Sequence, residues 1–127
     1  MGMKTTHQIR RKWADGCESI TTGHLQFDIT GQDGALRLRC RNGVTGWQRF
    51  FRTSPVFEDA AGTKLATIKL PLFAGGDFTL CLPDGRQERI NEMRPLPTGL
   101  TEELAMGVAC FRDMWFSAAA GDNDCGD

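Results

Sequence analysis

Two stretches of alternating apolar and polar residues flank the segment GQDG at 31–34. Apolar residues occupy every second position on both sides of it: Leu25, Phe27, Ile29, Leu36, Leu38 and Cys40. A period of two is typical of a strand that buries one face, and the intervening segment is rich in turn residues. The sequence therefore predicts a hairpin with a four-residue loop, in which Ile29 faces Leu36 on the buried side and Asp28 faces Arg37 on the other.

Further strands are predicted in this order along the chain: 47–53, 64–72, 78–82 and 86–91. Ser54-Pro55 ends the first of them, since the residue before a proline is restricted, and the residues that follow, 56–63, are expected to form a connection. The second and third form a predicted hairpin around FAGGD, with Ile68 opposite Leu82. The sheet is then expected to contain five to six antiparallel strands.

A helix is predicted near each end of the chain. Thr6 can cap a short N-terminal helix that runs to about Asp15 and stops before Gly16. A long C-terminal helix is predicted from Thr101 to about Ala120. An apolar stripe with helical spacing supports it: Leu104, Val108, Phe111 and Trp115. The predicted fold class is α+β, with the antiparallel sheet, the short N-terminal helix, and the long C-terminal helix packed on one sheet face.

The length of 127 residues fits a single domain that can bury its own core. Residues 1–5 are expected to be a flexible start, partly added ahead of a native Met3, and residues 121–127 a disordered tail. The longest apolar stretch, 104–120, is interrupted by Arg112-Asp113 and is too short to cross a bilayer, so no membrane partner is expected.

The five cysteines are scattered and odd in number. They form no C-x-x-C pair and no other ligand-like spacing, so the sequence indicates neither a zinc site nor a disulfide framework. No signal-peptide pattern is present either. These features predict a cytoplasmic protein with reduced thiols, without a metal or another cofactor.

The charges are divided unevenly along the chain. Residues 1–52 hold nine Lys and Arg against four Asp and Glu, whereas residues 53–127 hold six against twelve. The formal net charge of −1 is therefore the sum of a basic and an acidic part. Such a distribution can steer an anionic partner to one side of the molecule.

Catalytic motifs are missing from the sequence: no G-x-S-x-G, P-loop, H-E-x-x-H or G-x-G-x-x-G occurs. His7 and His24 are the two histidines that could exchange protons near neutral pH. Cys17 lies seven residues before His24, so a Cys–His pair is one enzymatic alternative. The sequence favours a protein that is not an enzyme and predicts no catalytic residue.

The segment ALRLRCRNGVTGWQRFFRT, residues 35–53, is the best candidate for a binding surface. It contains five arginines, three aromatic residues and no acid. In a pleated strand Arg37, Arg39 and Arg41 point to the same side, opposite to the buried residues. Arginine binds phosphate and carboxylate groups with two parallel hydrogen bonds and stacks on planar groups.

The register of the predicted strand 47–53 decides how the arginines meet. A loop over 42–46 would pair Arg39 with Arg49, which repel each other unless an anion or an acid from elsewhere lies over them. A two-residue turn at Asn42-Gly43 would instead put Arg49 on the core side, and both registers remain open. The candidate anion-binding or nucleic-acid-binding residues are Arg37, Arg39, Arg41, Trp47, Arg49 and Phe51.

Three functional hypotheses follow from these patterns. The first is a nucleic-acid-binding accessory or regulatory protein that uses a basic, aromatic-containing sheet face. The second is a protein-interaction module, such as an inhibitor, immunity or chaperone-like protein, that binds an acidic protein surface or forms a homodimer through the C-terminal helix. The interface residues predicted on that helix lie away from its apolar stripe: Met106, Ala109 and Phe116. The third is a small enzyme centred on His24 and Cys17.

Overall fold

The computed structural model of the chain describes residues 10–13, 16–44, 53–72 and 75–121. They form eight strands and one helix. The strands are β1 Arg10–Lys12, β2 Glu18–Gly23, β3 Gln26–Thr30, β4 Leu36–Asn42, β5 Pro55–Asp59, β6 Lys64–Lys69, β7 Phe78–Cys81 and β8 Gln87–Ile90, and the helix is α1 Glu102–Gly121. The fold class is α+β, as predicted.

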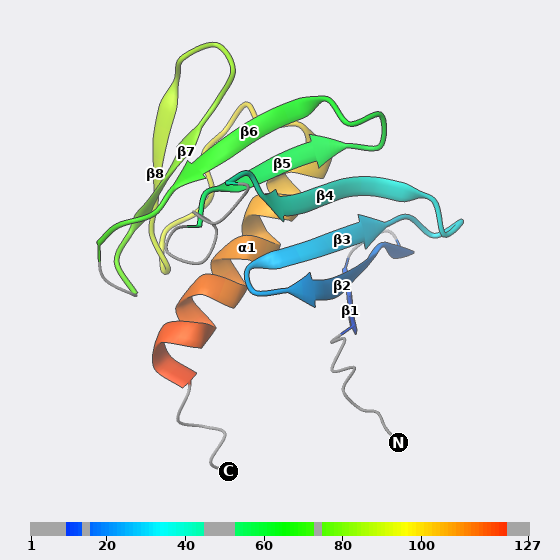
Figure 1. The fold of residues 1–127 in the computed structure, drawn as a ribbon, viewed down its shortest axis with the longest axis horizontal. Coiled ribbons are helices and arrows are strands. Elements are labelled where there is room, and N and C mark those ends of the chain that lie inside the picture. The colour runs from blue at the N-terminus through cyan, green and yellow to red at the C-terminus, as the bar shows by residue number, and fades with distance from the viewer. Residues whose placement is uncertain (1–9, 14–15, 45–52, 73–74, 122–127) are drawn as a thin grey trace.

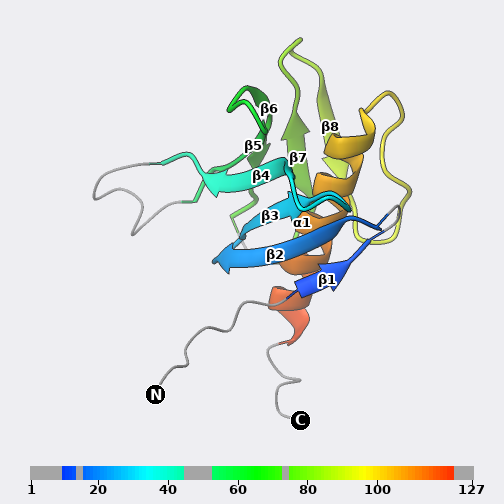
Figure 2. The same ribbon diagram turned by 90° about the vertical axis from the view of Figure 1, so that its right-hand side faces the viewer.

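All eight strands belong to one antiparallel sheet, in which spatial order follows chain order from β1 to β8. The helix α1 packs on one face of this sheet (Figure 1). Figure 2 shows the sheet curving around α1, so that strands from both of its ends approach the helix. We call the face against α1 the inner face and the opposite one the outer face.

The core lies between α1 and the inner face. Phe111 of α1 stands edge-on to Phe57 of β5 and to Phe78 of β7, with ring centroids 6.3 Å and 5.1 Å apart. Phe27 of β3 lies 6.3 Å from Phe57, which extends the aromatic cluster across the sheet. These four side chains are fully buried, and edge-on aromatic pairs add to the free energy gained from burial.

The helix backbone lies close to the sheet at Gly107. A Cβ atom at this position would lie 2.9 Å from one methyl group of Leu38 and 3.4 Å from the ring of Phe57. The lack of a side chain therefore lets the helix backbone approach the centre of the sheet. At its start, α1 is capped by the hydroxyl of Thr101, which accepts a hydrogen bond of 3.2 Å from the amide of Leu104.

Six of the predicted elements are confirmed, with small differences at their ends. The two strands that flank residues 31–34 correspond to β3 and β4, the strands expected at 64–72, 78–82 and 86–91 correspond to β6, β7 and β8, and the C-terminal helix corresponds to α1. The predicted stripe on α1 faces the sheet: Leu104, Val108 and Phe111 are buried and Trp115 is half-buried. The indole nitrogen of Trp115 donates a hydrogen bond of 2.9 Å to the carbonyl of Gly76.

The prediction of five to six strands is wrong, because the sheet has eight. Strand β2 escaped detection because Ser19, its buried inner-face residue, is polar, and strand β1 because all three of its residues are basic. Strand β5 lies where a connection was expected. Its first residue is Pro55, a position where a strand tolerates the missing amide donor, so the proline starts a strand.

The short N-terminal helix is also wrong over the part of the chain that the structure describes. Arg10–Lys12 are extended and pair with β2, Arg11 opposite Ser19. The remaining residues of that prediction, 6–9 and 14–15, lie outside the described residues, as do the expected flexible start at 1–5 and residues 122–127 of the expected tail.

Both predicted hairpins exist, but their registers differ by two residues from the expected ones. Ile29 pairs with Leu38 rather than Leu36, and Ile68 pairs with Leu80 rather than Leu82. A shift of two by itself leaves side chains on their predicted faces, so alternation alone cannot detect it. Leu25, expected in the first hairpin, instead sits in the turn before β3 with a left-handed φ of 57°.

Within the described ranges, no helix is long and apolar enough to cross a membrane.

The close contact at Gly107 yields a stability prediction. Gly107→Val should lower the free energy of unfolding by about 1–3 kcal/mol, because the branched side chain must displace Leu38 and Phe57. Ala109→Val, at a half-buried position on the same helix, is the matched control and should cost less than about 1 kcal/mol. Urea unfolding followed by circular dichroism measures both, and equal losses in the two variants would contradict the close packing.

Candidate binding surface on the outer face of the sheet

A β-bulge in β4 places one of its three arginines on a different face of the sheet from the other two. The register between β3 and β4 shifts between Ile29 and Thr30, and Arg37 is the extra residue of β4 at that point. Arg37 turns toward the helix side, where its guanidinium forms an ion pair with Glu103 of α1 and approaches the sulfur of Cys17 to 4.0 Å. The expectation that Arg37 faces Asp28 on the outer face is therefore wrong, because the bulge interrupts the alternation on which it relied.

Arg39 and Arg41 do lie on the outer face, and each is held by a carboxylate. Arg39 donates two hydrogen bonds to its cross-strand partner Asp28, of 2.8 Å and 3.2 Å. Arg41 binds the same carboxylate oxygen of Glu58 through two nitrogens, at 2.7 Å and 2.6 Å. The arginine side chains remain 49% and 42% exposed, so part of each guanidinium faces solvent in a fixed orientation.

Each carboxylate stabilises the charged form of its arginine. The hydrogen bond with Asp28 raises the pKa of Arg39, and the hydrogen bond with Glu58 raises the pKa of Arg41. Arginine is already protonated at all physiological pH values, so the role of the carboxylates is orientation rather than ionisation. Glu58 was missed by the sequence reasoning because it lies in β5, where a connection was expected after Pro55.

Glu58 also replaces the arginine expected opposite Arg39. Both considered registers paired β4 with the segment 47–53, but β4 pairs with β5, and Arg39 lies opposite Glu58. The repulsion between Arg39 and Arg49 that the first of these registers implied does not arise across this ladder. Trp47, Arg49 and Phe51 lie outside the described residues.

The residues on either side of segment 45–52 are hydrogen-bonded to each other. The side-chain oxygen of Asn42 accepts hydrogen bonds from the amides of Val44 and Ser54, of 3.1 Å and 3.0 Å. The amide of Gly43 also binds the carbonyl of Ser54 at 2.8 Å. Asn42 therefore fixes where the chain leaves β4 and returns toward β5, at the end of β4 next to Arg41.

Basic residues outnumber acidic ones on the outer face of the described strands. Cross-strand partners share a face, so the register assigns seven basic side chains to it: Arg10, Lys12, Arg39, Arg41, Lys64, Lys69 and Arg89. It assigns three acidic ones to the same face: Glu18, Asp28 and Glu58. This face carries net positive charge in a protein whose formal net charge is −1.

The structure does not bring together the residues of the enzymatic alternative. Cys17 is buried just before β2, and His24 is exposed in the turn after it. The six residues of β2 separate the two by about 20 Å, far beyond hydrogen-bond reach. Among the described residues, no group of three or more His, Cys, Asp and Glu side chains could hold a metal ion.

The three predicted interface residues on α1 differ in their surroundings. Phe116 is 8% exposed and packs against Phe78 of the same chain, with ring centroids 6.2 Å apart. Met106 and Ala109 are half-buried. The sheet reaches around the helix far enough to bury Phe116, which a helical stripe alone does not reveal. The homodimer stays a prediction, and Met106 and Ala109 are the residues on which it rests.

Comparison with known proteins gives no relative for this chain: we found no matching family model, no matching curated protein and no matching solved structure.

The ion pair between Arg37 and Glu103 predicts a pH-dependent stability. The hydrogen bond from Arg37 lowers the pKa of Glu103, so the unfolded chain takes up a proton more readily than the folded one as the pH falls. The pair should therefore stabilise the fold fully above the unfolded pKa of about 4.3, and this effect should be lost as the pH falls from there through the lower pKa of the folded state. The free energy lost in Arg37→Gln should be larger at pH 7 than at pH 3.

Urea titrations of four proteins at both pH values test this: the native chain, Arg37→Gln, Glu103→Gln and the double variant. The coupling between the two substitutions isolates the pair from other groups. A coupling of equal size at both pH values would contradict the assignment.

Proposed function

We propose that this protein is a non-enzymatic protein-interaction module that binds an acidic protein surface through the outer face of its sheet, around Arg39 and Arg41. The observation that carries the proposal is the fixation of both guanidinium groups by Asp28 and Glu58 while about half of each side chain stays exposed. An arginine that is already oriented loses less conformational entropy when it binds a partner's carboxylate.

The alternation of charge on this face favours a protein partner over a nucleic acid. Asp28, Arg39 and Glu58 stand side by side across β3, β4 and β5. A phosphate backbone is uniformly negative, so it would be repelled by Asp28 and Glu58 while it contacted Arg39. A protein surface can place its own basic residues opposite these two acids and its acidic residues opposite the arginines.

The outer face of the described strands also lacks an aromatic platform. The non-charged residues that the register places there are aliphatic or polar, such as Ile20, Thr67 and Thr79. Proteins that bind single-stranded nucleic acid without sequence preference stack bases on aromatic side chains. The nucleic-acid hypothesis therefore depends on Trp47 and Phe51, and we rank it second.

Affinity capture from a lysate of the source cells tests the proposal. The double variant Arg39→Gln/Arg41→Gln should lose a protein that the native chain captures, and nuclease treatment should leave the capture unchanged. Both substitutions are at exposed ion pairs, each worth about 0–1 kcal/mol, so the variant should stay folded. The matched control is Arg86→Gln/Arg94→Gln, which removes the same charge from residues outside the strands.

Two results would contradict the proposal. The first is that the Arg39/Arg41 variant still captures the protein. The second is that the control variant loses capture to the same degree. Either result would show that the outer face around Arg39 and Arg41 is not the binding surface. Direct binding of an oligonucleotide with a log–log salt slope of about −2 to −3 would instead support contacts to three or four phosphates, and with them the nucleic-acid hypothesis.

A further inference from the structure

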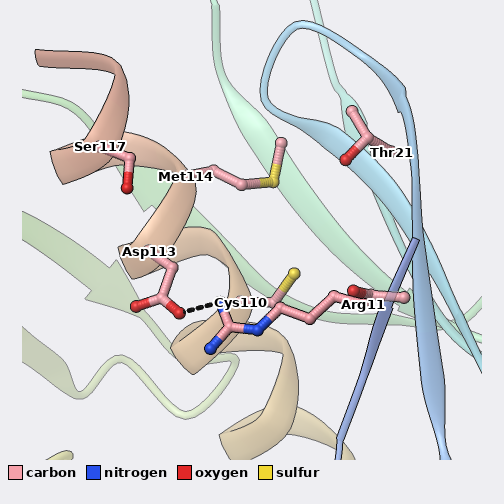
Figure 3. Close-up of a pocket in the computed structure, with 7 residues that line it drawn as sticks. Arg11, Thr21, Cys110, Asp113, Met114 and Ser117 are labelled. Atoms are coloured by element: carbon pink, nitrogen blue, oxygen red, sulfur yellow. Dashed lines mark hydrogen bonds and ion pairs between the residues drawn. The ribbon is translucent and has the colours of Figure 1, made fainter. Parts of the chain in front are cut away.

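A pocket of about 320 Å³ lies between strands β1 and β2 and the second half of α1 (Figure 3). It is on the inner side of the sheet, away from Arg39 and Arg41. Its volume is at the lower end of the range of about 300–1,000 Å³ that is usual for small-molecule sites. It is therefore suited to a small metabolite.

One side of the pocket carries two opposite charges. Arg11 points inward from β1, since it pairs with Ser19 of the inner face, and its guanidinium forms an ion pair with Asp113 of α1. The same guanidinium lies 4.2 Å from the ring centre of Trp13, which holds it in place. The side chains of Arg11 and Asp113 are 53% and 43% exposed, so both charges can be reached from solvent.

The rest of the pocket wall is largely apolar. Figure 3 shows Met114 and Thr21 across the space from the ion pair, with Cys110 beside it. Cys110 is 4% exposed, and burial raises the pKa of its thiol to about 11, so it is a neutral group at neutral pH. Methionine is a flexible side chain that adapts to ligands of different shape.

We propose that this pocket binds a free α-amino acid with an apolar side chain, with its carboxylate on Arg11, its ammonium group on Asp113 and its side chain against Met114 and Cys110. A zwitterion that enters between Arg11 and Asp113 replaces one ion pair by two, so neither protein charge loses its partner. A simple carboxylate or a simple amine would pair with only one of them and leave the other to solvent.

This site is independent of the proposed outer-face function. Arg11 is the inner residue of β1, whereas its neighbour Arg10 faces outward and lies 3.4 Å from Glu18. Arg10 is consequently a matched control: it has the same side chain, in the same strand, with a carboxylate partner, but on the other face.

Titration of the whole 127-residue chain with three related ligands tests the proposal. These are L-leucine, its amide L-leucinamide, which keeps only the positive charge, and 4-methylpentanoate, which keeps only the negative charge. Leucine should shift the methyl NMR signal of Met114 in a saturable way. Calorimetry should show that each analogue binds about tenfold or more weakly than leucine, because each lacks one charged hydrogen bond.

Substitutions in the protein supply the second half of the test. Arg11→Gln and Asp113→Asn should each weaken leucine binding about tenfold or more, and Arg10→Gln should leave it unchanged. Circular dichroism checks that each variant is folded. Asp113→Asn keeps the shape of the side chain, so it still tests the site if Arg11→Gln disturbs β1. The proposal is overturned if leucine leaves Met114 unshifted up to about 10 mM. It is equally overturned if an analogue binds as well as leucine, or if Arg10→Gln weakens binding as much as Arg11→Gln.

Discussion

The contact between α1 and the middle of the sheet is the interaction on which the rest of the structure depends. Within the described part of the chain, a meander of eight strands has one inner face, and α1 is the helix that covers it. Gly107 lets the helix backbone approach Leu38 and Phe57, so the sheet can curve around the helix and reach it from both ends. Phe78 of β7 contacts Phe116 from one side of the sheet, and Arg11 of β1, the first strand, pairs with Asp113 from the other.

The bulge in β4 links this packing to the candidate binding surface. An uninterrupted strand would place three arginines on the outer face, close enough to repel one another. The extra residue sends Arg37 to the helix side, where Glu103 receives it, and leaves Arg39 and Arg41 to pair with Asp28 and Glu58. One local irregularity therefore both ties the start of α1 to the sheet and produces a face on which oriented arginines alternate with acids.

The sequence predicts the parts of this fold that periodicity encodes. Alternation identified the faces of β3, β4, β6 and β7, and helical spacing identified α1 and most of its buried stripe. Period two cannot distinguish registers that differ by two residues, and it cannot foresee the bulge that turns Arg37 around. The strand β5 and the partner carboxylate Glu58 were missed because Pro55 acts as the first residue of a strand. The inward Arg11 was missed because it stands among three consecutive basic residues.

The bulge places Arg37 on the helix side and leaves Arg39 and Arg41 on the outer face, and side-chain NMR measures this directly. With the Nε–H signals of Arg37, Arg39 and Arg41 assigned, three variants are compared with the native protein: Asp28→Asn, Glu58→Gln and Glu103→Gln. The structure predicts that these variants shift the signals of Arg39, Arg41 and Arg37, respectively. If Asp28→Asn instead shifts the signal of Arg37, all three arginines share the outer face, and the bulge does not turn Arg37 toward the helix.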